Sequence, residues 1–156
     1  MINTYPLMEK AVKGFNEKRQ TSEDFHRILD DEDIYLDFWK LAEGVNGFYG
    51  VNRLHKKPRR YIVIDERLHQ NDSWLLTGFH ELVHHFLHVP QTSFEVYYSK
   101  CNVARREERE ADRYALLMLI PLPLLKEMMQ PGCDLIYQFS AENLSDRLKI
   151  NEQYGI

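Results

Sequence analysis

The sequence predicts a single α+β domain, mainly helical, with a small sheet of two or three strands packed beside a histidine-rich helix. Apolar residues at helical spacing cover most of the chain. Two segments near the middle, GFYGV at 47–51 and RYIVID at 60–65, instead have the β-branched and aromatic composition of strands. No repeat, low-complexity tract or second linker divides the 156 residues, so one domain over 1–156 is expected.

The N-terminal part, residues 1–45, is expected to be helical. Apolar spacing predicts a first helix over about 4–19 and a second that begins at Thr21 or Ser22, both of which are good caps. A third helix is expected over IYLDFWKLAEG, which would end at Gly44. The acidic run DDED before it has no ligand pattern around it, so it is expected to be a solvated helix end or loop.

The remaining elements alternate between strands and helices before the chain becomes helical again. Between the two strands lies a basic stretch, NRLHKKPRR, expected to be a solvated hairpin loop, with a phosphate- or nucleic-acid-binding patch as the alternative. A helix is expected from Trp74 to about His88, and SFEVYYS is the candidate for a third strand. Three more helices are expected, over about 103–120, over 122–129, and after a cap at Ser140.

Composition and charge narrow the class of protein. A formal net charge of −4 argues against a nucleic-acid-binding surface, which usually has a basic excess. The two cysteines, Cys101 and Cys133, form no CxxC pair, which favours free thiols in a reducing compartment. The N-terminus lacks the apolar core of a signal peptide, and Pro121 and Pro123 interrupt the most apolar segment. A cytoplasmic protein with no direct nucleic-acid or membrane partner is expected.

Four of the seven histidines lie within thirteen residues, GFHELVHHFLHVP. In this stretch His80, Glu81 and His84 spell HExxH. Two histidines four residues apart project from one side of a helix and can bind a single metal ion, and Glu81 can reach a water on that metal. Helical angles place His88 on the same polar side and His85 outside it, in solvent. The alternative is an amphipathic helix whose polar side happens to be rich in histidine.

A catalytic zinc site usually has three protein ligands, so the HExxH pair needs a third. The next long helix offers several carboxylates in ARREEREADRYALLML. Helical geometry places Glu108 on a narrow side of small and apolar residues, where a carboxylate is costly unless it is paired, protonated or bound to a metal. Glu108 is therefore the expected third ligand, with Glu107 in reserve.

Two further acidic residues of this helix have different expected partners. Asp112, one turn after Glu108, borders the same side and could accept a hydrogen bond from the outer ring nitrogen of His80 or His84. Such a bond would fix the tautomer and the orientation of the ligand. Glu110 lies on the polar side and is expected to pair with neighbouring arginines at the surface.

These stretches carry a resemblance to a known family. HExxH followed by a helix of form ExxxD, here EREAD, looks like the gluzincin metallopeptidases. More narrowly, HELVHHFLH, then EREADRYALLMLIP, then FSAENLSDRL, resembles the ImmA/IrrE family over roughly 48–148. Val83 stands where glycine is common, Tyr114 replaces the usual phenylalanine, and one extra residue precedes Pro121. None of these departures removes a ligand or the general base.

The resemblance implies a zincin-like fold with a catalytic core over 46–150 and a zinc-dependent peptidase or antirepressor that inactivates a helix-turn-helix repressor. Such proteins often act in prophage, mobile-element or stress-response regulation. With Zn²⁺ held by His80, His84 and Glu108, Glu81 would act as general base. Mn²⁺ or Fe²⁺ suits the same donors. The alternatives are a metal-bearing antirepressor that binds without cutting and a toxin–antitoxin component.

The resemblance leaves the oxyanion donor and the substrate strand open. Four residues are candidates for the donor, each with packing as its alternative role: Tyr97, Tyr98, Tyr114 and His88. RYIVID would be the edge strand to which an extended substrate segment adds by main-chain hydrogen bonds.

Overall fold

The structure, a computed structural model, describes residues 3–54, 56–70, 73–88, 96–98 and 105–156. The chain forms two compact units. One unit consists of Met1–Gln20 and Leu116–Ile156, and the other is the continuous segment Thr21–Ala115. The organisation as one domain stays a prediction.

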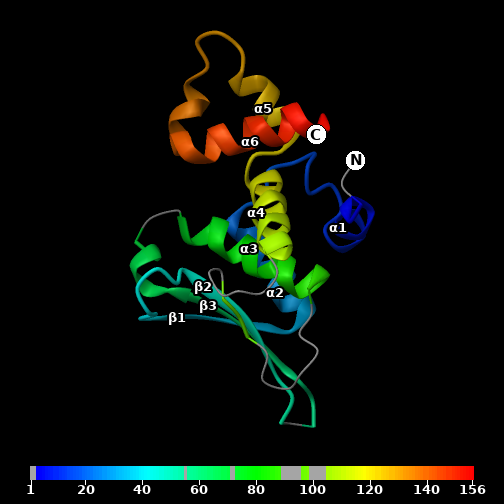
Figure 1. Cartoon of the computed structure of the whole chain (residues 1–156), viewed down its shortest axis with the longest axis vertical. Helices are drawn as coiled ribbons and strands as arrows, with labels where there is room; N and C mark the ends of the chain where they lie inside the picture. The colour runs from blue at the N-terminus through cyan, green and yellow to red at the C-terminus, as the bar shows by residue number, and fades with distance from the viewer. Residues whose placement is uncertain (1–2, 55, 71–72, 89–95, 99–104) are drawn as a thin grey trace. The chain divides into compact units, whose positions relative to one another are not determined.

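A four-stranded sheet forms the centre of the Thr21–Ala115 unit, in the order β1-β3-β2-β4 (Figure 1). Its strands are β1 (Ile34–Trp39), β2 (Gly47–Asn52), β3 (Arg59–Asp65) and β4 (Val96–Tyr98). β3 runs parallel to β1 and antiparallel to β2, and β2 pairs antiparallel with β4. The α+β class and the strands predicted from GFYGV and RYIVID are confirmed. Of SFEVYYS, only the β4 residues lie within the described part of the chain, and they do form a strand.

The prediction of a helix over IYLDFWKLAEG is wrong, because the first six residues of this segment form β1. Ile34 pairs with Arg60 and Trp39 with Asp65, so the whole strand is in register with β3. The turn before it uses Asp33 in the left-handed conformation, with φ 54°, which ends the preceding helix and redirects the chain. The segment has apolar residues at both helical and strand spacing, and pairing with β3 decides between the two.

The outer side of β1 carries a local hydrogen-bond arrangement around Asp37. One carboxylate oxygen of Asp37 accepts the backbone N–H of Phe38 at 2.8 Å, and the other accepts Nε1–H of Trp39 at 2.8 Å. Trp39 is 49% exposed, as expected for a residue on an edge strand. Asp37 therefore occupies both a backbone and a side-chain donor of its own strand.

β3 lies inside the sheet, between β1 and β2. Both of its hydrogen-bonding edges are therefore occupied, and the expectation that RYIVID is an edge strand open to a substrate is wrong. The two edges among the described strands are β1 and β4. The basic stretch forms the connection between β2 and β3, where Lys57 makes an ion pair with Asp33.

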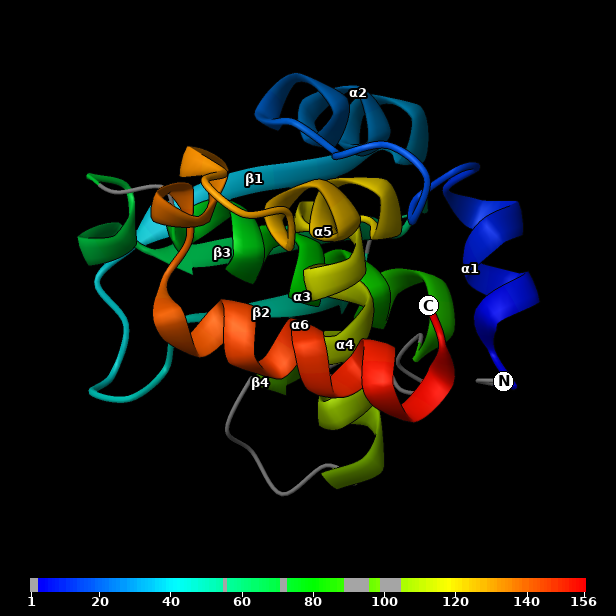
Figure 2. The same ribbon diagram turned by 90° about the horizontal axis from the view of Figure 1, so that it is seen from above.

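Two helices pack on this sheet, α2 (Ser22–Glu32) on β1 and α3 (Ser73–Leu87) on β2 and β3 (Figures 1 and 2). Thr21 caps α2 as predicted: its hydroxyl accepts the N–H of Asp24, and the Asp24 carboxylate accepts the N–H of Thr21. On α3 the fully buried Phe79, Leu82 and Val83 face the interior. The apolar side of α3 therefore holds the helix against the sheet.

The other unit is helical. It contains α1 (Tyr5–Ala11), the last residues of α4 (Arg105–Leu119), α5 (Leu122–Met128), a 3₁₀ turn (Asp134–Gln138) and α6 (Ala141–Tyr154). The first helix is shorter than predicted. The other predicted helices are confirmed, including the cap at Ser140, whose Oγ accepts the N–H of Asn143 at 3.1 Å.

Arg147 of α6 is fully buried and links several segments of its unit. Its guanidinium donates to the backbone oxygens of Ile120 and Ile156 at 2.6 and 2.7 Å and to Oδ1 of Asn16 at 3.3 Å. Burial lowers the pKa of Arg147 to about 10. Among the described residues, no helix has the length and apolar character needed to cross a bilayer.

Candidate metal centre

The centre begins with two histidines of α3. His80 and His84 lie four residues apart, so their side chains leave the same side of the helix. Their Nε2 atoms face each other at 3.1 Å, and both side chains are buried. The opposite side of α3 packs on the sheet, which fixes the direction in which these two rings point.

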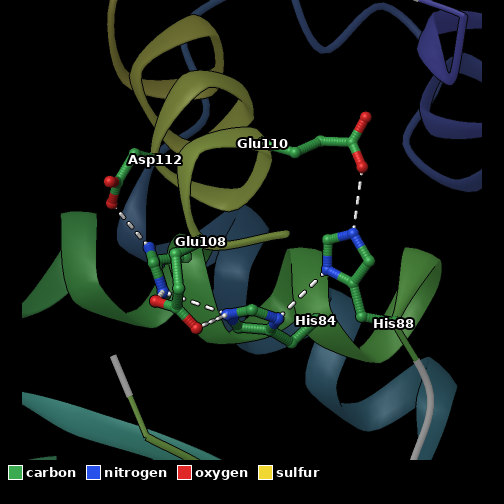
Figure 3. A network of polar contacts seen from close by, with 6 residues as sticks. His84, His88, Glu108, Glu110 and Asp112 are labelled. Carbon is green, nitrogen blue, oxygen red and sulfur yellow. Dashed lines mark hydrogen bonds and ion pairs between the residues drawn. The ribbon is translucent and has the colours of Figure 1, made fainter. Parts of the chain in front are cut away.

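Glu108 of α4 completes the cluster. Its Oε2 lies 3.2 Å from Nε2 of His80, and its Oε1 lies 3.3 Å from Nε2 of His84 (Figure 3). One ligand atom from each of the three residues falls within 4.8 Å of the others. Glu107, the reserve ligand, is partly buried and belongs to no such cluster among the described residues. The structure thus brings together the three residues predicted as ligands.

The donor set suits a divalent cation. Both carboxylate oxygens of Glu108 are buried, and neither has the alignment of a hydrogen bond with a described partner. Two imidazole nitrogens therefore converge on a buried carboxylate, at 3.2 and 3.3 Å from its two oxygens. Such orphaned buried atoms are costly, and a metal ion would satisfy them at once. Two nitrogens and one carboxylate are common ligands for zinc and suit other divalent metals.

The ionisation of the cluster also favours a positive charge at this position. Burial lowers the pKa of His80, but the carboxylates of Asp112 and Glu108 beside the ring outweigh this effect and raise the pKa to about 10. Burial lowers the pKa of His84, and the charge on His80 lowers it further. Burial raises the pKa of Glu108, yet the two histidines outweigh it and bring the value down to about 2. The carboxylates therefore draw a cation into the site.

Glu81 lies beside the cluster and is fully buried. Both of its carboxylate oxygens are buried without a hydrogen bond among the described residues. Burial raises the pKa of Glu81 to about 8, opposed by His80 and reinforced by Glu108. Gly47 of β2 makes room for this side chain, since a Cβ there would lie 3.3 Å from its Oε1 and 2.8 Å from Cγ2 of Thr77.

Asp112 contacts His80 on the side away from the cluster. Its Oδ1 lies 2.8 Å from Nδ1 of His80, while the Nε2 of the same ring faces Glu108. The carboxylate accepts a hydrogen bond from Nδ1–H, and in the neutral ring this leaves the lone pair of Nε2 directed into the cluster. Figure 3 shows Asp112 and Glu108 on the same side of α4.

Comparison with known proteins agrees with this geometry. The profile of the IrrE N-terminal-like domain, peptidase M78, matches residues 30–154. The chain belongs to this family. No curated protein and no solved structure matches it significantly. The matched region of this M78 peptidase includes the HExxH helix and Glu108, so family and cluster together indicate a metallopeptidase, an enzyme class whose substrates are proteins or peptides.

His88 of this M78 peptidase makes two polar contacts beside the cluster, one of them with a residue that the sequence did not predict as its partner. Nδ1 of His88 lies 3.1 Å from Nδ1 of His84, and its Nε2 lies 3.0 Å from Oε2 of Glu110 (Figure 3). The surface role expected for Glu110 is corrected here, because its side chain reaches the buried His88 and is only 13% exposed. Helical angles gave the direction of Glu110, but they could not show that the end of α3 lies there.

The expectation that His85 is exposed is wrong. His85 is buried, with Nδ1 2.8 Å from the hydroxyl of Tyr49 and Nε2 2.9 Å from Oε2 of Glu32. α2 and β2 cover this side of α3, which the periodicity of α3 alone does not reveal. Burial raises the pKa of Tyr49 to about 12, so its hydroxyl keeps its proton.

The candidates for an oxyanion donor have different positions. Tyr114 is fully buried in α4, and both ring nitrogens of His88 already lie against His84 and Glu110. The side chains of Tyr97 and Tyr98 lie outside the described part of the structure. A catalytic role for Tyr114 stays a prediction.

Proposed function

We propose that this chain is a zinc-dependent endopeptidase that cleaves a helix-turn-helix transcriptional repressor. The observation that supports the reaction is the convergence of His80, His84 and Glu108 within 4.8 Å, with the buried Glu81 beside them. A structural zinc site has no use for a general base beside its ligands, and Glu81 is a fully buried carboxylate in that position. The repressor as substrate rests on the family resemblance.

In this proposal His80, His84 and Glu108 bind the metal, and Glu81 acts as general base and then as general acid. Bound Zn²⁺ would act as a Lewis acid that polarises the scissile carbonyl and acidifies a water molecule. Glu81 takes one proton from the attacking water as the new C–O bond forms, and it delivers that proton to the amine nitrogen as the C–N bond breaks. Its raised pKa, about 8, suits a group that must both accept and donate near neutral pH.

Asp112 supports this chemistry by holding His80. Its contact with Nδ1, at 2.8 Å, keeps the proton of the ring away from the cluster. An extended substrate segment would add to β4, since β3 lies between β1 and β2 and β4 is at an edge of the sheet formed by the described strands. Gly47, on the neighbouring strand β2, lies next to Glu81, and this supports β4 as the strand to which the substrate adds.

The decisive experiment separates binding of the metal from cleavage. Glu81→Gln should retain stoichiometric zinc by elemental analysis and lose cleavage of the repressor by at least about 100-fold, because the amide cannot accept the proton of the water. His80→Ala should lose both the metal and the cleavage. Wild-type cleavage by Glu81→Gln would refute the mechanism.

The same mixture tests the substrate. The repressor should lose DNA binding and appear on a gel as two fragments. Loss of DNA binding with the repressor chain intact would instead show a sequestering antirepressor or a toxin–antitoxin partner. Elemental analysis of the purified protein also identifies the metal, since Mn²⁺ and Fe²⁺ suit the same donors.

A further inference from the structure

We propose that His88 and Glu110 form a positioning pair that keeps the proton of His84 on Nδ1 and so leaves the lone pair of Nε2 for the metal. This inference rests on the proposed function, because it concerns the metal-binding role of His84. In this role His88 acts through His84 and contacts neither the substrate nor the metal. It also gives Glu110 a function that its sequence position does not suggest.

The pair is part of a continuous row of polar contacts. From the cluster outward, Nδ1 of His84 lies 3.1 Å from Nδ1 of His88, whose Nε2 lies 3.0 Å from Oε2 of Glu110. Figure 3 shows the rings of His84 and His88 on α3 and the carboxylate of Glu110, from α4, above the ring of His88. His84 and His88 are four residues apart, so successive turns of one helix bring the rings together.

Only one arrangement of protons satisfies this row when His84 binds a metal. A ligating Nε2 must offer its lone pair, so the proton of His84 is on Nδ1. Nδ1–H of His84 then donates to Nδ1 of His88, which must carry a lone pair. The proton of His88 is consequently on Nε2, where it donates to the carboxylate of Glu110. The acceptor at the end of the row therefore sets the tautomer at its beginning.

Because His84 and His88 are buried, the loss of the hydrogen bond between them would not be made good by water. His84 is completely buried, and the side chain of His88 is only 5% exposed, so bulk water does not compete for the bond between them. In an exposed pair a lost contact is replaced by water at little cost, whereas buried polar atoms depend on their protein partners.

In both metal-binding histidines a carboxylate thus fixes the proton on Nδ1, directly in His80 and through a second ring in His84. Asp112 contacts Nδ1 of His80 directly at 2.8 Å, while Glu110 acts on Nδ1 of His84 through His88. Both carboxylates come from α4, the helix that also supplies Glu108. One helix therefore provides a ligand and orients both of the others.

The tautomer is measured directly by NMR of the metal-free protein with ¹⁵N-labelled histidine rings. We expect the wild type to carry the proton of His84 on Nδ1, and His88→Ala to move it to Nε2. His88→Gln should restore the Nδ1 tautomer, because the glutamine amide offers one acceptor towards His84 and one donor towards Glu110. A wild-type His84 with its proton on Nε2 would overturn the proposal.

Affinity for Zn²⁺ provides a second readout, by competition with a chromophoric chelator at fixed pH. Loss of an outer hydrogen bond to a ligating histidine typically weakens metal binding about 10–100-fold, and this is expected for His88→Ala. Glu110→Ala should weaken it in the same direction. The double variant should bind no more weakly than His88→Ala alone, because Glu110 acts through His88. Additive losses, or a Kd for His88→Ala within about 3-fold of wild type, would contradict the proposal.

His85→Ala is the matched control. His85 is the next residue after His84 on the same helix and is also buried, but its contacts go to Tyr49 and Glu32. It should lower thermal stability and leave both the tautomer of His84 and the Kd for Zn²⁺ unchanged. If His88→Ala does not fold, His88→Gln and Glu110→Ala decide the question. If the wild type binds no Zn²⁺, the proposed function fails while the tautomer still tests this pair.

Discussion

The pKa values of Glu81 and Glu108 shift in opposite directions because the neighbours of the two carboxylates differ. Burial raises the pKa of Glu81 to about 8, and the charge on His80 does not offset it. Burial acts on Glu108 too, but the two histidines in contact with it lower its pKa to about 2. One carboxylate is therefore suited to stay charged and bind a cation, and the other to take up and release a proton.

Asp65 on β3 is an acid-sensitive residue outside the metal centre. Its buried carboxylate accepts hydrogen bonds from Nε and Nη2 of Arg67 at 2.6 and 2.7 Å and from the backbone N–H of Leu41 at 3.0 Å. The bonds from Arg67 hold the pKa of Asp65 well below its ordinary value of 3.8, against the effect of burial. A lowered pKa stabilises the fold above the pKa of the unfolded chain, and this contribution is lost as the pH falls below it.

We therefore expect Asp65→Asn to lower the free energy of unfolding at pH 7, and the difference from wild type to narrow between about pH 4 and pH 2. Urea denaturation at pH 7, 4 and 2 measures it. Glu66→Gln, which changes an exposed neighbour, should follow the wild type throughout. A difference that stays constant with pH would show that Asp65 acts through packing alone.

At the scale of elements, α3 carries His80 and His84 on one side and packs closely on α2 and the sheet with its other sides. Gly78 permits the approach of α2, since a Cβ at this position would lie 2.7 Å from Cζ of Phe25. That ring is fully buried and stacks edge-on against Phe79 and Trp74, at centroid distances of 5.4 and 5.8 Å. The ring therefore has little freedom to move away.

Gly78→Ala should destabilise the protein by about 1–3 kcal/mol, as overpacking of a core does, despite the better helix propensity of alanine. Chemical denaturation measures the loss. The double variant with Phe25→Leu, which shortens the opposing side chain, should recover part of it. Equal stability of Gly78→Ala and wild type would mean that α2 and α3 can separate without cost.

β1 shows where prediction of elements from sequence fails. Its residues have apolar spacing compatible with a helix, and the strand exists because β3 pairs with it along its whole length. The pairing joins Ile34 with Arg60, two residues too far apart in the sequence for any local pattern to contain both. By contrast, α2 and α6 have caps at Thr21 and Ser140, so their starts were visible in the sequence.

At the scale of the molecule, the metal would join two helices that are separate in sequence, α3 and α4. Because Zn²⁺ binds the folded chain and its ligands disperse on unfolding, it should raise the stability. At about 1,000 times its Kd the linkage is worth about 4 kcal/mol. For a chain of this length that corresponds to a rise in Tm of roughly 10 °C.

This rise in Tm should depend on Glu108 and not on its neighbour. Differential scanning fluorimetry with and without Zn²⁺ should show it for the wild type and for Glu107→Ala, and much less of it for Glu108→Ala. Addition of a chelator should reverse it. Retention of the full rise by Glu108→Ala, with loss in Glu107→Ala, would exchange the two assignments.

The three candidate ligands were predictable because the position of each depends on the geometry of one helix. His80 and His84 follow from spacing, and Glu108 follows from the cost of a carboxylate on an apolar helix side. The partners of His85 and Glu110 were not predictable, because they depend on which other element covers the helix. Periodicity gives the direction of a side chain and says nothing of what it meets.

The position of Asp37 has a consequence for solubility. β1 is an edge of the sheet, and an open edge that also exposes Tyr35 and Trp39, at 54% and 49%, invites pairing with another molecule. Asp37 places a charge between these aromatic residues and occupies the N–H of Phe38 that an incoming strand could use. Asp37→Ala should therefore increase light scattering with concentration, whereas an unchanged profile would mean that this edge does not need protection.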